Sequence, residues 1–198
     1  MFVQLITGRT PESGQLLARF DLWSRGVQAG AVGFLGATIG VASDGVAIAV
    51  VRFADAASAR ANETRPDQQA WWTDTASTFD GPPDVVESCD VEVVFDGGSD
   101  DAGFVQVIRG RIRDRARLAQ LNTPELLAEV HATRPDIFGG LRVWLDDGNF
   151  VEVVYFTGEE SARQGETSSE FERAHAEIET LYDSLTFVDL TEPTFLSP

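Results

Sequence analysis

Two stretches of the sequence recur at nearly the same spacing, and this internal repeat limits the possible folds more than any other feature. Residues 2–9 match residues 104–111 at an offset of 102, with six of eight positions identical. Residues 44–64 match residues 147–167 at an offset of 103, with ten of 21 positions identical. Average residue usage gives about one or two chance matches in a window of that size. We therefore interpret the chain as two copies of one folding unit.

The first copy predicts an order of secondary structure elements. Residues 2–9 are largely apolar and β-branched, which favours a strand, and apolar residues at helical spacing follow Ser13. Two apolar runs, 33–42 and 46–53, flank an Asp-Gly pair that is typical of a tight hairpin. We expect a helix over 55–64 that restarts at a proline and fades before a proline-rich turn, followed by a last strand. That last strand is expected at residues 86–95.

The second copy predicts the same order. Its strands are expected at 138–145 and 149–156, around a second Asp-Gly pair, with helices over 159–182 and a last strand at 184–190. Each copy then reads βαββαβ, the ferredoxin-like arrangement, whose helices cover one face of the sheet. Because both alternating sets of residues in 150–156 are largely apolar, we expect the other face to be covered as well.

These observations predict an α+β fold of two ferredoxin-like repeats packed sheet to sheet within one chain. The expected domains are residues 1–95 and 104–198, joined by a polar, glycine-rich linker at 96–103. The pairing would make a pseudo-dimer from a single chain, and a homodimer of that chain also stays open.

Charge excludes several classes of function. The chain has 32 acidic and 15 basic residues, a formal net charge of −17, and every basic residue is an arginine. Such a surface repels nucleic acid and anionic lipid. Without lysine, Schiff-base chemistry and the phosphate-binding lysine of a P-loop are also excluded.

Cysteine content and the chain start bear on location. Cys89 is the only cysteine, so neither an intrachain disulfide nor a multi-cysteine metal site is expected. Residues 26–43 carry no charge and resemble a membrane span, but charged residues such as Arg142 interrupt the matching stretch of the second copy. Because residue 2 already begins a strand-like run, we expect no secretory signal, no membrane partner and a cytoplasmic location.

Several motifs resemble those of the dimeric α+β barrel superfamily, which includes the antibiotic-biosynthesis monooxygenase-like proteins. They are the opening strand, the Asp-Gly hairpin, the strand ending in Val-Val-Tyr-Phe at 153–156, Ser161-Ala162-Arg163 and Phe171-Glu-Arg-Ala-His175. The resemblance implies two ferredoxin-like units paired as a barrel. It also implies activities as different as cofactor-independent oxygenation, haem degradation and isomerisation, so the fold does not choose among them.

His175 is the candidate catalytic base, because its setting resembles the helix that carries the histidine of haem-degrading relatives. Those relatives also need an asparagine on the first strand and a tryptophan about ten residues before the histidine. This chain has Gln106 and Gly165 at those places, which argues against haem. His175 and His131 show no metal-ligand spacing, so we predict no bound metal and no cofactor. A structural role for either histidine stays open.

Five residues are candidates for binding a substrate. Gln4 and Gln106 occupy equivalent places on the two opening strands, where an amide must be hydrogen-bonded and could orient a ligand. Arg111 belongs to an arginine-rich corner suited to a carboxylate or phosphate group. Trp72 and Trp144 could wall a pocket for a flat molecule. For each, a purely structural role is the alternative.

The sequence therefore leads to two hypotheses for function. One is a cofactor-independent monooxygenase, or a related enzyme, acting on a small aromatic or hydrophobic substrate, with His175 as base and Gln106 as orienting group. The other is a non-catalytic small-molecule-binding or stress-associated barrel protein. Because duplicated copies diverge, we expect a single copy, the second, to keep an open pocket.

Overall fold

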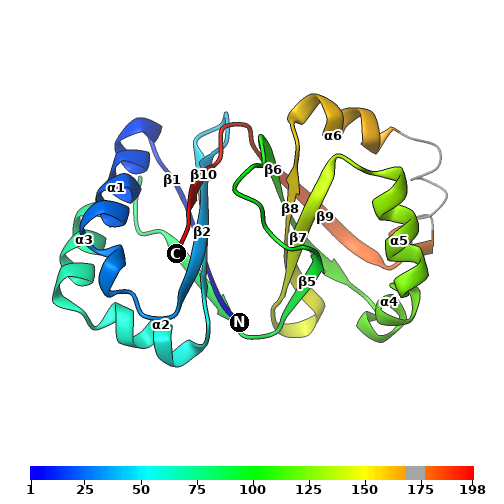
Figure 1. Cartoon of the computed structure of the whole chain (residues 1–198), viewed down its shortest axis with the longest axis horizontal. Helices are drawn as coiled ribbons and strands as arrows, with labels where there is room; N and C mark the ends of the chain where they lie inside the picture. The colour runs from blue at the N-terminus through cyan, green and yellow to red at the C-terminus, as the bar shows by residue number, and fades with distance from the viewer. Residues whose placement is uncertain (168–176) are drawn as a thin grey trace. The chain divides into compact units, whose positions relative to one another are not determined.

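The computed structural model describes residues 1–167 and 177–198 of the chain (Figure 1). It divides into two compact units, one formed by Met1–Val91 with Glu192–Pro198 and the other by Glu92–Thr191. Within the described ranges, no helix combines the length and the apolar character needed to cross a membrane. Each unit is an α+β structure, as the sequence predicts, and each is built on an antiparallel sheet of five strands where four were expected.

The first unit follows the predicted order of elements. Its elements along the chain are β1 (Phe2–Arg9), α1 (Ser13–Gly26), a 3-10 turn η1 (Gln28–Gly30), β2 (Phe34–Val41), β3 (Val46–Phe53), α2 (Ala56–Glu63), α3 (Pro66–Ala76), β4 (Asp84–Ser88) and β10 (Thr194–Leu196). The sheet order is β10-β2-β3-β1-β4. Asp55 caps α2 by accepting from the Ser58 backbone N–H at 2.7 Å, and a proline begins α3, where its missing N–H costs nothing.

The second unit repeats this plan. Its elements are β5 (Val91–Phe95), β6 (Phe104–Ile112), α4 (Arg115–Leu121), α5 (Pro124–Thr133), β7 (Ile137–Trp144), a 3-10 turn η2 (Asp146–Gly148), β8 (Asn149–Phe156), α6 (Glu159–Glu166) and β9 (Tyr182–Leu190). The sheet order is β5-β7-β8-β6-β9. Because β9 already begins at Tyr182, the expectation of a helix extending to residue 182 is wrong.

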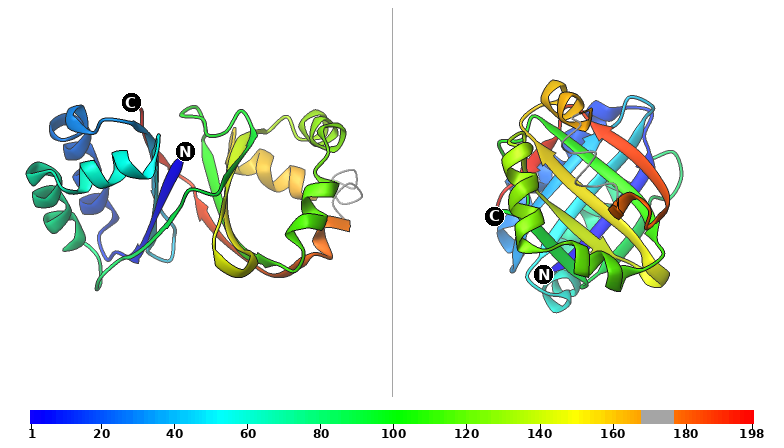
Figure 2. Two further views of the ribbon diagram at one scale, coloured as in Figure 1. Left: turned by 90° about the horizontal axis from the view of Figure 1, so that it is seen from below. Right: turned by 90° about the vertical axis from the view of Figure 1, so that its right-hand side faces the viewer.

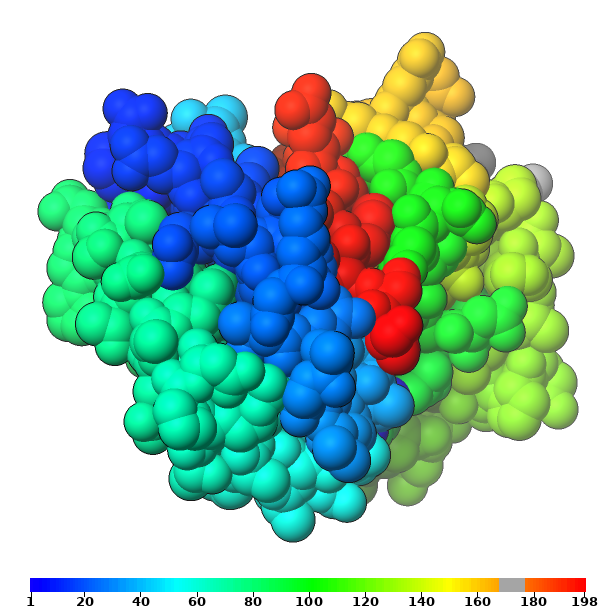
Figure 3. Space-filling view, turned by 60° about the vertical axis from the view of Figure 1, so that its left-hand side comes forward, coloured from blue at the N-terminus to red at the C-terminus, as the bar shows by residue number. Residues whose placement is uncertain are grey.

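The two edge strands β5 and β10 differ from the sequence expectation. A single strand at 86–95 was expected, but the chain forms β4 in the first sheet and then β5 beside β7 in the second sheet. At the other end, β10 returns to the first unit and pairs with β2 (Figure 3). The compact units therefore differ from the expected ranges 1–95 and 104–198 at these two strands.

Equivalent strands keep the same register in both units. Gln4 faces Val51 across β1 and β3, and Gln106 faces Val154 across β6 and β8. In each unit the helices cover one face of the sheet (Figure 2). Side chains alternate across the sheet, so the even-numbered residues of β6 face the helices. This helix-covered face carries the core of each unit.

Candidate functional site

The second unit has a partly open cavity of about 650 Å³ between its sheet and its helices. The sheet supplies apolar walls such as Ile108, Phe150 and Val154, and α5 supplies Leu126 and Val130. Fifteen of the 25 lining residues are apolar or glycine, and the ten polar ones, seven of them charged, come from separate elements. A largely apolar lining with polar groups at defined places suits a small-molecule site.

The first unit has a smaller cavity, of about 320 Å³, at the equivalent place. Gln4 and Val51 line it just as Gln106 and Val154 line the larger one. The expectation that one copy alone keeps a pocket is therefore wrong, although the second unit does have the larger one.

Helix geometry explains why the cavities differ in volume. In the first unit α1 is continuous and buries Phe20 and Trp23, which pack edge-on against aromatic neighbours. At the offset of 102, Asn122 takes the place of Phe20, and here the helix is interrupted between α4 and α5. Pro124 forces the preceding residue into an extended conformation, which ends the helix. The space filled by aromatic rings in the first unit is thereby left open in the second.

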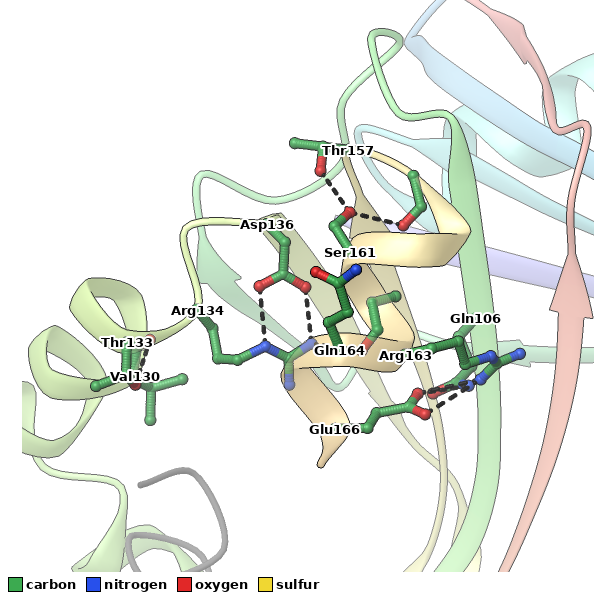
Figure 4. Close-up of polar contacts among 12 residues, drawn as sticks. Gln106, Val130, Thr133, Arg134, Asp136, Thr157, Ser161, Arg163, Gln164 and Glu166 are labelled. Carbon is green, nitrogen blue, oxygen red and sulfur yellow. Dashed lines mark hydrogen bonds and ion pairs between the residues drawn. The ribbon is translucent and has the colours of Figure 1, made fainter. Parts of the chain in front are cut away.

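A hydrogen-bonded network, which we call the glutamine network, lies at the edge of the second-unit cavity. Gln106 Nε2 donates to Asp189 at 3.1 Å and to Glu166 at 3.4 Å. Arg163 Nη1 donates to Glu166 at 3.2 Å (Figure 4), and Arg163 also pairs with Asp189. The network joins β6, α6 and β9, so it fixes the position of α6 over the sheet.

The first unit contains the same network at the equivalent positions. Gln4 Nε2 donates to Glu63 at 2.6 Å and to Glu87 at 2.8 Å, and Arg60 Nη1 donates to Glu87 at 2.7 Å. The hydrogen bond from Arg60, with a smaller contribution from Gln4, holds the pKa of Glu87 below its ordinary value against the opposing effect of burial. Both predicted glutamines thus line a cavity and are hydrogen-bonded there.

A buried ion pair distinguishes the second unit. Arg142 on β7 donates from Nε and Nη2 to Glu152 Oε2 on β8, at 3.2 and 2.8 Å. The two side chains are 8% and 14% exposed, and both line the cavity. Burial by itself would lower the pKa of Arg142, but the charge and hydrogen bond of Glu152 together with the charges of Tyr182 and Glu92 outweigh burial, and the pKa is raised. The guanidinium therefore stays charged at every physiological pH.

Tyr182 lies on the wall beside this pair. Its ring stacks against Phe150 with centroids 5.7 Å apart, and the Arg142 guanidinium lies 5.7 Å from the centroid of the same Phe150 ring. Burial raises the pKa of Tyr182, and the charge of Glu152 raises it further against the opposing effect of Arg142. The phenol is thus kept neutral and can donate a hydrogen bond.

A second buried ion pair supports the end of the cavity near α5. Arg134 donates to both carboxylate oxygens of Asp136, at 2.9 and 2.8 Å, and its side chain is 2% exposed (Figure 4). This bidentate geometry holds the guanidinium flat in the wall. The Arg134 guanidinium and the Asp136 carboxylate are hydrogen-bonded to each other, so we assign the pair a structural role.

The remaining predicted site residues lie apart from one another. Arg111 is exposed at the β7–β8 hairpin and donates to Asp147 at 3.1 Å, where it does not line the cavity. Trp144 is buried below the cavity wall, with Arg115 stacked 4.1 Å from its ring centroid. Trp72 lines the first-unit cavity. His175, the predicted base, lies outside the described residues.

Arg142, Glu152 and Tyr182 were not among the candidates from sequence. The signal for the pair was present, because at the offset of 103 it replaces Ile39 and Ala49 of the first copy. A charge that interrupts an apolar strand in one copy, and is absent from the other, marks a position where the copies have diverged. Tyr182 carried no such signal, since it was assigned to a helix.

The described part of the chain contains no group of three or more histidine, cysteine or acidic side chains arranged to hold a metal ion. The described residues that line the second-unit cavity include no histidine, and His175, the histidine to which the resemblance points, lies outside the described residues.

Comparison with known proteins identifies the fold. No protein-family model and no curated protein matches the chain. Among solved structures, a candidate monooxygenase from Fusobacterium nucleatum matches with a TM-score of 0.79 at 9% identity, covering 99% of this chain and 94% of that chain. This chain has the fold of the monooxygenase-like ferredoxin-fold proteins. A candidate monooxygenase from Lactobacillus acidophilus matches with a TM-score of 0.73 at 10% identity, covering 99% and 96%.

An anthrone oxidase-like protein shares the same monooxygenase-like fold, with a TM-score of 0.66 at 8% identity and coverage of 99% of this chain and 92% of that chain. All three matches span both units, and two five-stranded sheets in one chain fit a fused pseudo-dimer of this fold. At such identities the likeness concerns the fold and carries no site residue from one protein to another.

Proposed function

We propose that the second-unit cavity binds a small, largely apolar molecule and that the protein is a cofactor-independent monooxygenase acting on an aromatic substrate. The cavity itself carries this proposal, because its volume of about 650 Å³ and the apolar side chains that make up most of its lining suit such a ligand. The anthrone oxidase-like protein of the same fold makes anthrone a rational first substrate to test.

The reaction needs little from the protein. Anthrone and one molecule of O2 give anthraquinone and one molecule of water. A base removes a proton from the methylene carbon, the carbanion gives electrons to O2, and a carbon–oxygen bond forms. The second oxygen atom leaves in water with both methylene hydrogens. The protein must bind the ring, accept the first proton and exclude bulk water. His175 remains our proposal for the base, and Gln106 for a group that orients the substrate.

Two equivalent valines provide a matched test of binding. Val154→Phe would place a bulky ring in the second-unit cavity, and Val51→Phe would do the same in the first. We expect anthrone to raise the melting temperature of the wild-type protein and of Val51→Phe, and to raise that of Val154→Phe less. Equal shifts for all three proteins would place the ligand elsewhere and contradict the proposal.

Oxygen uptake separates catalysis from binding. With anthrone we expect O2 consumption and anthraquinone formation by the wild-type protein, and a loss of at least about tenfold in rate for His175→Gln with binding retained. The alternative function is non-catalytic binding, favoured by the fact that Gln106, Glu166 and Asp189 are already hydrogen-bonded within the glutamine network. Binding without O2 uptake would support that alternative.

Origin and location complete the proposal. We infer that the two units arose by duplication, which the matching segments and the shared strand register support. The acidic composition and single cysteine support a cytoplasmic protein. Association of the chain into a homodimer is open to sedimentation analysis.

A further inference from the structure

We propose that Arg142 binds an oxygen atom of the ligand, a ketone or phenol oxygen, and thereby determines which apolar molecules the second-unit cavity accepts. This inference rests on the proposed function, since it requires that the cavity binds a small molecule. It goes further by naming the chemical group that the ligand must carry and the residue that recognises it.

The hydrogen bonding of Arg142 carries the inference. Its Nε and Nη2 atoms donate to Glu152, but its buried Nη1 atom has no hydrogen-bond partner among the described residues. The nearby Glu92 carboxylate is 4.0 Å from Nη1, beyond hydrogen-bond distance. A buried donor left without an acceptor is unfavourable, and such groups call for an explanation. Because Arg142 lines the cavity, a ligand oxygen is the acceptor that would complete its hydrogen bonding.

The fold does not require this arginine. Arg142 and Glu152 are paired across β7 and β8, and the same register position holds Ile39 and Ala49 in the first unit. Those two residues are fully buried in the apolar core. The sheet can therefore form with an apolar pair at this register position, and only the second cavity has a charged pair there. The first cavity is expected to show no preference for an oxygen-bearing ligand.

Local charge favours a neutral oxygen over an anion. Arg142 is balanced by Glu152, and Glu92 is shared with Arg115 at 3.4 Å. Further carboxylates, Glu179 and Asp189, lie around the cavity wall. A ketone or phenol accepts a hydrogen bond from Nη1 without adding a negative charge to this setting. Tyr182 lines the same cavity, and its hydroxyl, which burial keeps protonated, is a second hydrogen-bond donor for a ligand there.

A pair of probes that differ in one oxygen tests the inference. Binding of 2-naphthol and of naphthalene to the full chain is measured by calorimetry and by tryptophan fluorescence. If the cavity offers no hydrogen-bond partner for the hydroxyl of 2-naphthol, burying that hydroxyl is unfavourable, and naphthalene should bind more tightly. With Arg142 as partner, we expect 2-naphthol to bind the wild-type protein about tenfold more tightly or better.

Two variants assign this preference to Arg142. Arg142→Ile with Glu152→Ala installs the apolar pair of the first unit, and we expect it to bind naphthalene and to lose the preference for 2-naphthol. Arg142→Lys keeps the charge opposite Glu152 but lacks the second terminal nitrogen, and it too should lose most of the preference. Val51→Phe, which fills the first cavity, should keep it.

The outcomes separate this inference from the proposed function. If wild-type protein binds both probes with equal affinity, or if both Arg142 variants keep the preference for 2-naphthol, recognition by Arg142 is wrong while the cavity stands as a binding site. If neither probe binds, the proposed function fails and this inference fails with it. The wild-type comparison needs no variant, so the inference is testable even if one variant does not fold.

Discussion

Arg142 and Glu152 form a buried ion pair across β7 and β8, with 2.8 Å between Nη2 and Oε2, where the first unit has two apolar side chains. Removing two charges from water has a desolvation penalty that is about as large as their attraction in the interior. A buried ion pair therefore stabilises the fold no more than a well-packed apolar pair does. Its presence in the unit with the larger cavity is better explained by the ligand than by the fold.

Removing one partner of this pair should be worse than removing both. Glu152→Ala leaves Arg142 charged and buried, and we expect the free energy of unfolding of the second unit to fall by about 3–5 kcal/mol. Arg142→Ile with Glu152→Ala should stay within about 1 kcal/mol of wild type or exceed it. Urea unfolding followed by tryptophan fluorescence and circular dichroism makes the comparison. Equal losses in the single and double variants would contradict this account of the pair.

Acid should selectively weaken the glutamine network of the first unit. Because the pKa of Glu87 is lower in the folded than in the unfolded state, its contribution is complete above the unfolded value and is lost as the pH falls through the folded value. We expect Glu87→Gln to lower the free energy of unfolding by about 1 kcal/mol at neutral pH. The difference from wild type should shrink once the pH falls below the ordinary glutamate pKa of about 4.3, and it should disappear in strong acid. The control is Glu12→Gln, because Glu12 is exposed. If the difference in the free energy of unfolding between Glu87→Gln and wild type persisted in acid, the prediction would be wrong.

Much of the fold could be predicted from sequence because the repeat allowed one copy to check the other. The hairpin strands flanking each Asp-Gly pair were placed within one residue, since apolar runs and turn residues are local signals. The exchange of β5 and β10 could not be predicted in this way. Both strands are short, and which sheet an edge strand joins depends on tertiary pairing rather than on its own residues.

The candidate site was predicted only in part, for a similar reason. Gln4 and Gln106 stood out because an amide within an apolar strand is unfavourable alone. Arg142 was not identified as a site residue, because a charged residue near the end of a strand is ordinarily expected to be exposed to solvent. Its burial becomes evident only when the partner strand is known. The volume of the cavity depends on the break between α4 and α5, and the local sequence pattern does not predict how much space such a break leaves.

Gly139, at the register shift between β7 and β8, should be essential to the packing of edge strand β5 against β7. Gly139 has a φ of +159°, and a Cβ there would lie 2.3 Å from the Gly97 carbonyl oxygen, which follows β5. We expect Gly139→Ala to lower the free energy of unfolding of the second unit by more than about 2 kcal/mol, since both backbone and contact are strained. Gly14 lies in α1 with no atom within 4 Å of a built Cβ. Gly14→Ala should therefore be neutral or stabilising by up to about 1 kcal/mol, and comparable losses in the two variants would contradict the assignment.

Tyr182 should resist ionisation in alkali. Its pKa is raised by burial first and by the charge of Glu152 second, so its neutral form stabilises the folded state. That stabilisation is complete below the unfolded pKa of about 10 and is lost as the pH rises through the folded value. The chain has two tyrosines, so the ultraviolet difference between wild type and Tyr182→Phe isolates this one. We expect tyrosinate absorbance from Tyr182 to appear only above pH 10 or so, and Tyr182→Phe to lose less stability than wild type over that range. Ionisation at the ordinary pH would mean that the phenol faces water, and its proposed role as a second donor to the ligand oxygen would then fail.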